Sequence, residues 1–153
     1  MTGVYRKNVA VFVLNSDGFI LACERADVGG AWQLPQGGIE PGESSIEAMY
    51  RELHEEIGCR DVEILHQLEE AIRYEWPPHL QDKGYVGQEQ VYFLVRLLPE
   101  AAIDLVNAES GEFQSVEWVN AAEFSARAGG FKREAYLEAL KRLLDAFPGT
   151  IQE

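Results

Sequence analysis

Acidic side chains are concentrated in one short segment of the chain, where their spacing is suited to chemistry. Residues 43–57 contain five glutamates and one arginine, namely Glu43, Glu47, Glu52, Glu55, Glu56 and Arg51. If the segment is helical, Glu52, Glu55 and Glu56 share one face, because residues three and four apart are neighbours on a helix surface. Two carboxylates about 5 Å apart repel each other by roughly 3 kcal/mol at an effective dielectric of about 20. Bound hard cations would remove this repulsion, whereas a plain solvated acidic face is the alternative interpretation.

The ligand types near this cluster favour magnesium over zinc. Mg²⁺ prefers oxygen ligands and is typically shared between a few carboxylates and the phosphates of a substrate. A glycine-rich stretch, residues 35–42, lies directly before the cluster. The three histidines, His54, His66 and His79, show neither H-E-x-x-H nor paired E-x-x-H spacing, so zinc is a poorer match.

Sequence signals at both ends of the acidic segment predict a helix that carries the cluster. Ser44 followed by Glu47 fits a capping box. Apolar residues then recur at helical spacing until Gly58, at Ile46, Met49, Leu53 and Ile57. Glu55 and Glu56 fall in the last turn, where the helix dipole disfavours negative charge. A helix selected only for stability would avoid this placement.

Apolar runs on both sides of this helix predict the remaining elements. The predicted strands are Val9–Leu14, Phe19–Arg25, Trp32–Leu34, Val62–Leu68, Ala71–Trp76, Gln90–Leu97 and Ser115–Val119. Residues 15–18 form a turn that joins the first two strands. Asn120 and Glu123 indicate a short capped helix, and an apolar stripe from Tyr136 to Phe147 indicates a C-terminal helix. The pattern predicts an α+β fold, an α/β/α sandwich with a mixed β-sheet.

Length and charge limit the kinds of partner that the chain can have. With 153 residues, of which 46% are hydrophobic, residues 1–153 are expected to form a single domain around one core. The formal net charge of −13 disfavours a broad surface that tracks phosphates, and therefore long duplex nucleic acid as a partner. Small anionic substrates, or the end of a nucleic acid, remain possible where local cations meet them.

Neither end of the sequence nor its cysteines points to secretion or to a membrane. The N-terminal residues reach Arg6 and Lys7 without an apolar stretch of signal length, and no later run approaches the roughly 20 residues of a membrane span. Cys23 and Cys59 lie in hydrophobic patterns without C-x-x-C spacing, which favours buried, reduced thiols. The sequence predicts a cytoplasmic protein with no membrane partner.

The segment from Gly37 to Cys59 resembles the complete Nudix box. Its diagnostic residues follow in order as Gly37, Glu43, Arg51-Glu52-Leu53, Glu55-Glu56 and Gly58, with the spacings of that motif. Cys59 stands where the family usually has an aliphatic residue, a departure that concerns packing rather than chemistry. The resemblance implies a Nudix sandwich fold, catalysis with divalent metal ions, and substrates in which a nucleoside diphosphate is linked to another moiety.

The resemblance also assigns roles to individual residues of the box. Glu52, Glu55 and Glu56 match the positions that hold the metal ions, and the backbone of Gly37 can approach metal or phosphate closely. Glu43 and Arg51 match an ion pair that supports the loop-helix-loop. The general base stays open between Glu52, Glu56 and a residue outside the box.

Further landmarks resemble two related groups of the superfamily, the bacterial RNA pyrophosphohydrolases and the asymmetric diadenosine tetraphosphate hydrolases. They include the segments 5–9, 32–39, 48–50, 73–74, 87–93 and 131–134. By this resemblance Glu112 is an additional metal ligand and a member of the catalytic set. Substrate phosphates would contact Arg6, Arg25 and Lys132, although the register at Arg25 can slip by one. Tyr74 and Phe131 would line the nucleotide cleft, with ordinary core aromatics as the alternative.

The expected function is Mg²⁺-dependent hydrolysis of a phosphoanhydride bond, with Mn²⁺ as a possible substitute for Mg²⁺. The expected substrate is the 5′-triphosphate or diphosphate end of RNA, because the 131–134 segment is present. Hydrolysis of dinucleoside polyphosphates is the alternative, and a nucleotide-binding Nudix module without turnover is a remote one. The sequence leaves the oligomeric state open.

Overall fold

The first long strand runs through the middle of the sheet and is buried on both of its faces. Strand β1 spans Val4–Leu14, and residues 9–14 are fully buried. Because side chains alternate along a strand, Val9, Val11 and Val13 join one core cluster. The residues between them, Ala10, Phe12 and Leu14, join the other. The computed structural model describes residues 3–81 and 84–153, and its two core clusters lie on opposite faces of the sheet.

The sheet is mixed, as predicted. Its further strands are β2 (Ile20–Arg25), β3 (Trp32–Gln33), β4 (Gln36–Gly38), β5 (Val62–Gln67), β6 (Ile72–Glu75), β7 (Tyr85–Leu97) and β8 (Phe113–Val119). The central order is β3-β2-β1-β7-β5, while β4 pairs with β1, β6 with β7 and β8 with β2. Strands β1 and β7 are parallel, and the other pairs are antiparallel.

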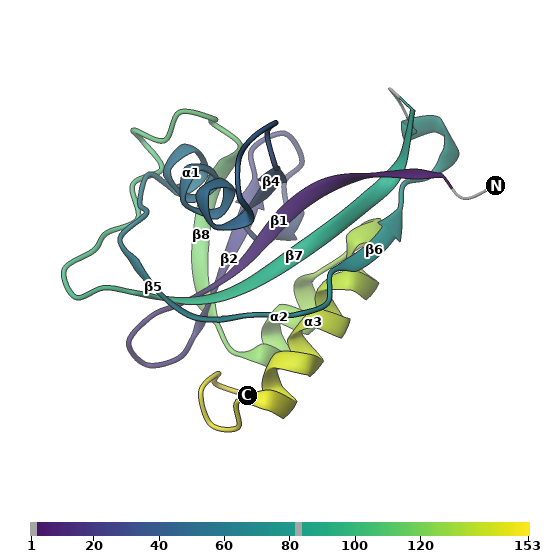
Figure 1. The fold of residues 1–153 in the computed structure, drawn as a ribbon. Helices are drawn as coiled ribbons and strands as arrows, with labels where there is room; N and C mark the ends of the chain where they lie inside the picture. The colour runs from purple at the N-terminus through teal and green to yellow at the C-terminus, as the bar shows by residue number, and fades with distance from the viewer. Residues whose placement is uncertain (1–2, 82–83) are drawn as a thin grey trace.

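Helices cover the two faces of the sheet and complete the predicted α+β sandwich (Figure 1). On one face α1 (Ser45–Ile57) packs its apolar stripe, including Met49 and Leu53, against the valines of β1. On the other face lie α2 (Ala121–Arg127) and α3 (Arg133–Ala146), with Tyr136 and Leu140 of α3 in the core. Two short 3₁₀ turns, η1 (Pro78–Leu80) and η2 (Gly130–Lys132), precede β7 and α3.

The predicted helix signals are confirmed by the structure. The Ser44 hydroxyl accepts a hydrogen bond from the Glu47 amide at 3.1 Å, and the Glu47 carboxylate accepts one from the Ser44 amide at 3.0 Å. Helix α1 ends at Gly58, whose φ of 65° lies in the left-handed region that glycine adopts without strain. Asn120 and Glu123 form the same reciprocal cap on α2.

Three strand predictions need correction. Strand β4 was predicted as loop, because its residues Gln36, Gly37 and Gly38 lack apolar alternation, yet they pair with residues 8–10 of β1. Strands β1 and β7 begin at Val4 and Tyr85, five residues earlier than predicted. The additional residues are mostly polar and pair with each other in a parallel extension of the sheet. Residues 82–83, which lie between the predicted strands 71–76 and 90–97, are outside the described residues.

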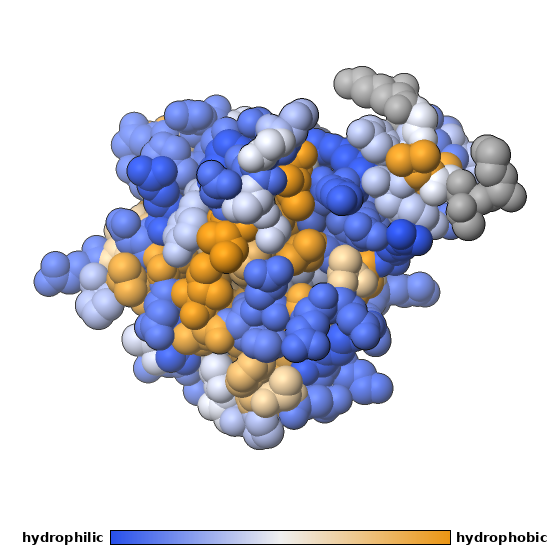
Figure 2. Space-filling model, viewed as in Figure 1, coloured by the Kyte–Doolittle hydropathy of each residue, from blue (hydrophilic) through white to orange (hydrophobic). Residues whose placement is uncertain are grey.

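Hydrophilic side chains cover much of the face seen in Figure 1, and most of its apolar surface gathers near the middle, with a smaller apolar patch at the upper right (Figure 2). Both cysteines are free and buried, as predicted. In the part of the chain that the structure describes, no helix is long and apolar enough to cross a bilayer.

Candidate active site

Helix α1 turns two of the box glutamates toward the interior. Glu52 and Glu56 lie one turn apart on the side that faces β4, and their exposed fractions are 8% and 2%. The backbone amide of Gln36 in β4 donates to a Glu56 carboxylate oxygen at 2.8 Å. Glu55 lies at the edge of this cluster and is half-buried. The apolar stripe of the helix therefore fixes where the acidic face points.

Strand β4 lies close to the side chain of Glu52 at Gly37 and to that of Arg6 at Gly38, so a side chain at either position would force its neighbour to move. A Cβ atom at Gly37 would overlap the carboxylate of Glu52. A Cβ atom at Gly38 would overlap the guanidinium group of Arg6, an exposed residue of β1. The Gly37 backbone therefore lies beside the Glu52 carboxylate, and the Arg6 cation lies beside Gly38 of the same strand.

Glu112 joins this cluster from a distant part of the sequence. It directly precedes β8, and its backbone oxygen accepts from the Ala26 amide at 2.8 Å. Burial raises the pKa of Glu56 well above its ordinary value, and the neighbouring carboxylates of Glu112 and Glu52 raise it further. Burial also raises the pKa of Glu52. The structure therefore brings together carboxylates whose negative charges repel one another.

Arg51 ties the glycine-rich loop to the helix. Its Nε and Nη2 atoms donate to the two Glu43 carboxylate oxygens at 2.7 and 2.8 Å, and Nη2 also donates to the Gly38 carbonyl at 2.8 Å. Its Nη1 atom donates to Glu52 at 2.8 Å and to Glu55 at 3.2 Å. The hydrogen bonds from Arg51 hold the pKa of Glu43 at about 2, below its ordinary value.

We expect Glu43→Gln to lower the free energy of unfolding by about 1–3 kcal/mol at neutral pH, the usual range for a lost charged hydrogen bond. Since folding depresses the pKa of Glu43 from 4.5 to about 2, its stabilising contribution is present above about 4.5 and fades as the pH falls toward about 2. Urea denaturation at pH 7 and pH 4 measures this, with exposed Glu70→Gln as the control. An equal stability loss at both pH values would contradict it.

The donor set of the cluster fits a hard divalent cation, because Glu52, Glu55, Glu56 and Glu112 offer only carboxylate oxygens. No group of three or more His, Cys, Asp or Glu side chains within residues 3–81 and 84–153 is already arranged to hold a metal ion. Arg51 donates hydrogen bonds to Glu52 and Glu55, two of these four carboxylates. The assignment of these glutamates and Gly37 as ligands stays a prediction.

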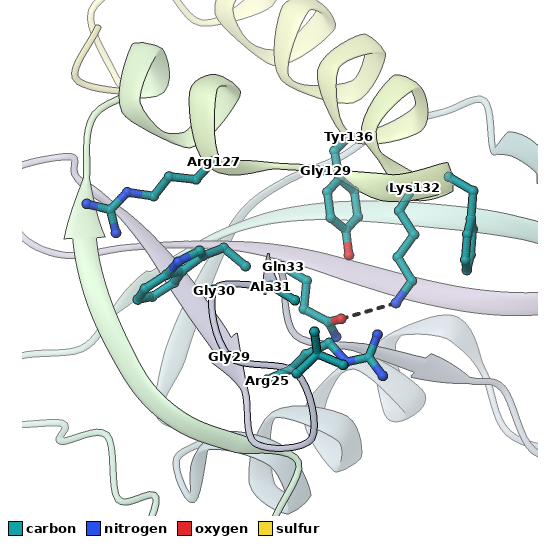
Figure 3. Close-up of a pocket in the computed structure, with 13 residues that line it drawn as sticks. Arg25, Gly29, Gly30, Ala31, Gln33, Arg127, Gly129, Lys132 and Tyr136 are labelled. Carbon is teal, nitrogen blue, oxygen red and sulfur yellow. Dashed lines mark hydrogen bonds between the residues drawn. The ribbon is translucent and has the colours of Figure 1, made fainter.

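A cavity of about 320 Å³, called here the cationic pocket, is lined by residues within 25–33 and 127–132 and by residue 136, among them three basic side chains (Figure 3). The residues of its lining used below are Arg25, Trp32, Gln33, Arg127, Phe131 and Lys132. Burial and the nearby Arg25 lower the pKa of Lys132, whereas the carboxylates of Glu112 and Glu56 act in the opposite direction. Lys132 therefore lies between the acidic cluster and the pocket.

The predicted cleft aromatics occupy different environments. Tyr74 is 8% exposed, belongs to the core and accepts a hydrogen bond from Gln88 at 2.7 Å. Phe131 is 40% exposed, and its ring centroid lies 6.0 Å from that of Tyr74. Phe131 lines the cationic pocket on one side and, with Tyr74, a second cavity of about 340 Å³ on the other. The core interpretation thus fits Tyr74 and not Phe131.

Arg25 lines the pocket at the end of β2, where the pairing with β8 shifts register between Glu24 and Arg25. Its guanidinium donates to both carboxylate oxygens of Asp27, at 2.8 and 2.5 Å. Sequence reasoning did not assign Gln33, Trp32 or Arg127 to the site. Arg127 stacks over the Trp32 ring at 4.9 Å, a contact between residues far apart in the sequence that no local pattern encodes.

Comparison with known proteins places these observations in a family. The NUDIX domain matches residues 4–140. An RNA pyrophosphohydrolase from Helicobacter pylori is 42% identical over 143 residues, 89% of this chain and 91% of that protein. An RNA pyrophosphohydrolase from Sulfurovum sp. is 44% identical over 150 residues, 94% of this chain and 92% of that protein.

Solved structures share the fold at much lower sequence identity. The E. coli dihydroneopterin triphosphate pyrophosphohydrolase matches with a TM-score of 0.69 and 20% identity, covering 91% of this chain and 99% of its own. A C. elegans Ap4A hydrolase in a binary complex matches with a TM-score of 0.66 and 21% identity, covering 93% and 99%. At these identities the likeness concerns the fold alone.

Proposed function

Because the chain belongs to the NUDIX family, we propose that it hydrolyses a phosphoanhydride bond at the 5′-triphosphate or diphosphate end of RNA. Relatives named RNA pyrophosphohydrolase that align with about nine tenths of the chain support this substrate. The structural observation that carries the proposal is the cationic pocket, which is lined by Phe131 and Lys132. The carboxylates of Glu112 and Glu56 are close enough to act on the charge of Lys132.

The pocket suits the second part of such a substrate. Its cavity of about 320 Å³ lies at the lower end of the roughly 300–1,000 Å³ typical of small-molecule sites, and an RNA end needs only a local cleft. The exposed ring of Phe131 offers a stacking surface. Lys132, Arg25 and Arg6 supply cations to the phosphates. This local positive charge lets an anionic end approach a protein whose net charge is −13.

The acidic cluster is proposed to hold Mg²⁺, or Mn²⁺ in its place, through Glu52, Glu55, Glu56 and Glu112 with the Gly37 backbone. Such a cation lowers the pKa of a bound water and offsets the charge of the bridging phosphates. The general base is proposed to be Glu52, Glu56 or a residue outside the box. The ion pair between Glu43 and Arg51, with the hydrogen bond from Arg51 to the Gly38 carbonyl, holds the glycine-rich segment against helix α1.

Hydrolysis of dinucleoside polyphosphates is the second candidate. It requires the same bond cleavage, and the strongly acidic composition favours small substrates over long nucleic acids. Both substrates place a second nucleoside near Phe131, so stacking alone does not separate them. Specificity constants on diadenosine tetraphosphate and on a short 5′-triphosphorylated RNA, at one salt concentration, separate them. We expect the RNA to be at least as good a substrate, and a hundredfold preference for diadenosine tetraphosphate would reverse the order.

Phe131→Ala is expected to lower kcat/KM on the triphosphorylated RNA by about tenfold or more, since loss of a base-stacking partner costs about 1–3 kcal/mol. Hydrolysis of adenosine triphosphate, which has no second nucleoside, should change little. Trp118→Ala, at an exposed aromatic residue of β8 that lines neither cavity, is the control. If Phe131→Ala left RNA hydrolysis unchanged, the pocket would not be the nucleotide cleft.

A further inference from the structure

We propose that Gln33 is a positioning residue that holds Lys132 over the cationic pocket and completes, through its side-chain NH₂ group, a cluster of phosphate-binding donors. This inference rests on the proposed function of the same site. Gln33 belongs neither to the acidic box nor to the basic residues of the chain, and the burial and hydrogen bonding of its side-chain amide indicate its role.

The backbone around Gln33 fixes the direction of its side chain. Gln33 ends the two-residue strand β3 and pairs with Cys23 of β2, at the edge of the sheet. Its exposed fraction is 3%. A glutamine buried to this degree in a paired strand has little freedom to choose another orientation, so its amide occupies a defined place in the wall of the pocket.

The two halves of the Gln33 amide are used unequally. Its oxygen accepts a hydrogen bond from the Lys132 ammonium group at 3.2 Å, across 99 residues of sequence (Figure 3). Its nitrogen is buried and has no hydrogen-bond partner among the residues that the structure describes. A buried donor without a partner costs about 1–3 kcal/mol, so such groups call for an explanation, and a bound ligand is one.

The charges around the pocket identify the kind of ligand that would supply the missing acceptor. Figure 3 shows Lys132 and Gln33 joined from opposite walls, with Arg25 on the same side as Gln33. Lys132 and Arg25, the latter also paired with Asp27, carry N–H donors, and the buried NH₂ group of Gln33 lies in the same wall. A phosphate oxygen is an acceptor suited to such donors. A leucine at position 33 would leave Lys132 without its acceptor, and a glutamate would add a charge that repels phosphate.

Binding in the absence of turnover tests the inference without depending on the substrate. The probe is adenosine triphosphate in excess EDTA, measured by isothermal titration calorimetry on the full chain. We expect Gln33→Leu to weaken binding about tenfold and Gln33→Glu to weaken it further. Gln67→Leu in β5, at the opposite edge of the sheet, should bind like the unaltered protein. The Tm of Gln33→Leu should not fall, because the change removes a buried donor that lacks a partner.

A double-mutant cycle separates positioning from general packing. If Gln33 acts partly through Lys132, the weakening in Gln33→Leu with Lys132→Met falls well short of the product of the two single effects. On RNA, Gln33→Leu should raise KM about tenfold and change kcat less than about threefold. Affinity of Gln33→Leu within twofold of the unaltered protein, or full additivity in the cycle, overturns the inference. Failure of the unaltered protein to hydrolyse RNA, with this binding pattern intact, overturns only the proposed function.

Discussion

Replacing Glu56 by glutamine is expected to reduce kcat/KM by several orders of magnitude, at least about a thousandfold. Glu56 is 2% exposed, accepts the Gln36 amide and lies beside Glu112 and Glu52. The substitution keeps the volume and the hydrogen-bond acceptor but removes the charge that the proposed cation and the transition state require. Glu55→Gln is expected to act in the same direction, through the same cluster.

The same substitution should leave the fold intact or stabilise it in the absence of metal. Burial and neighbouring carboxylates raise the pKa of Glu56 in the folded state. Its carboxyl group therefore favours folding while protonated, and this contribution is lost as the pH rises above the unfolded value of about 4.3 toward the folded pKa. In EDTA, Glu56→Gln should match the unaltered protein in Tm near pH 4 and exceed it near pH 8.

Glu70→Gln, on an exposed residue, is the matched control for both measurements. It removes one negative charge without touching the cluster, so its activity and Tm should follow the unaltered protein. Activity within tenfold of the unaltered protein for both Glu55→Gln and Glu56→Gln would end the assignment of the cluster as the catalytic site. A Tm gain of equal size at both pH values would contradict the account of the buried charge.

Elements whose folding rule is local were predictable from the sequence. The capping boxes at Ser44 and Asn120 and the left-handed glycine at Gly58 each depend on contacts within a few residues, so their patterns were sufficient. The continuous apolar run of residues 9–14 similarly predicted a strand, and the structure buries that run on both faces. Helical spacing put Glu52, Glu55 and Glu56 on one face, and the packing of α1 against the sheet turns Glu52 and Glu56 inward.

Features set by distant contacts were not predictable in the same way. Strand β4 carries two glycines and no apolar alternation, and it forms because β1 offers an unpaired edge. The polar starts of β1 and β7 stabilise each other as a pair and neither signals a strand alone. Gln33 meets Lys132 across 99 residues, so the amide's role depends on a contact that no spacing rule describes. Only the family resemblance identified Glu112 as a candidate member of the site.

Removal of divalent cations is expected to abolish activity, and addition of Mg²⁺ or Mn²⁺ to restore it. The structural reason is the accumulation of carboxylates around Glu56, where burial and the neighbouring carboxylates raise the pKa values of Glu52 and Glu56. Arg51 donates hydrogen bonds to Glu52 and Glu55. Ca²⁺ is larger and less strict in geometry, so it should bind but support much less hydrolysis. Full activity after exhaustive chelation would contradict the proposed chemistry.

A stability measurement makes this last prediction independent of catalysis. A ligand that binds only the folded state at about a hundred times its Kd stabilises that state by about 2.7 kcal/mol, so saturating Mg²⁺ or Ca²⁺ should raise Tm. In Glu56→Gln the rise should be much smaller, because one carboxylate of the cluster is gone, whereas Glu70→Gln should retain it. The gain for the unaltered protein should shrink as acid protonates the cluster, since protons and the cation compete for the same oxygens. A rise in Tm that is equal in all three proteins would place the cation elsewhere on the acidic surface. The glutamate cluster around Glu56 would then lose its proposed role as the metal site.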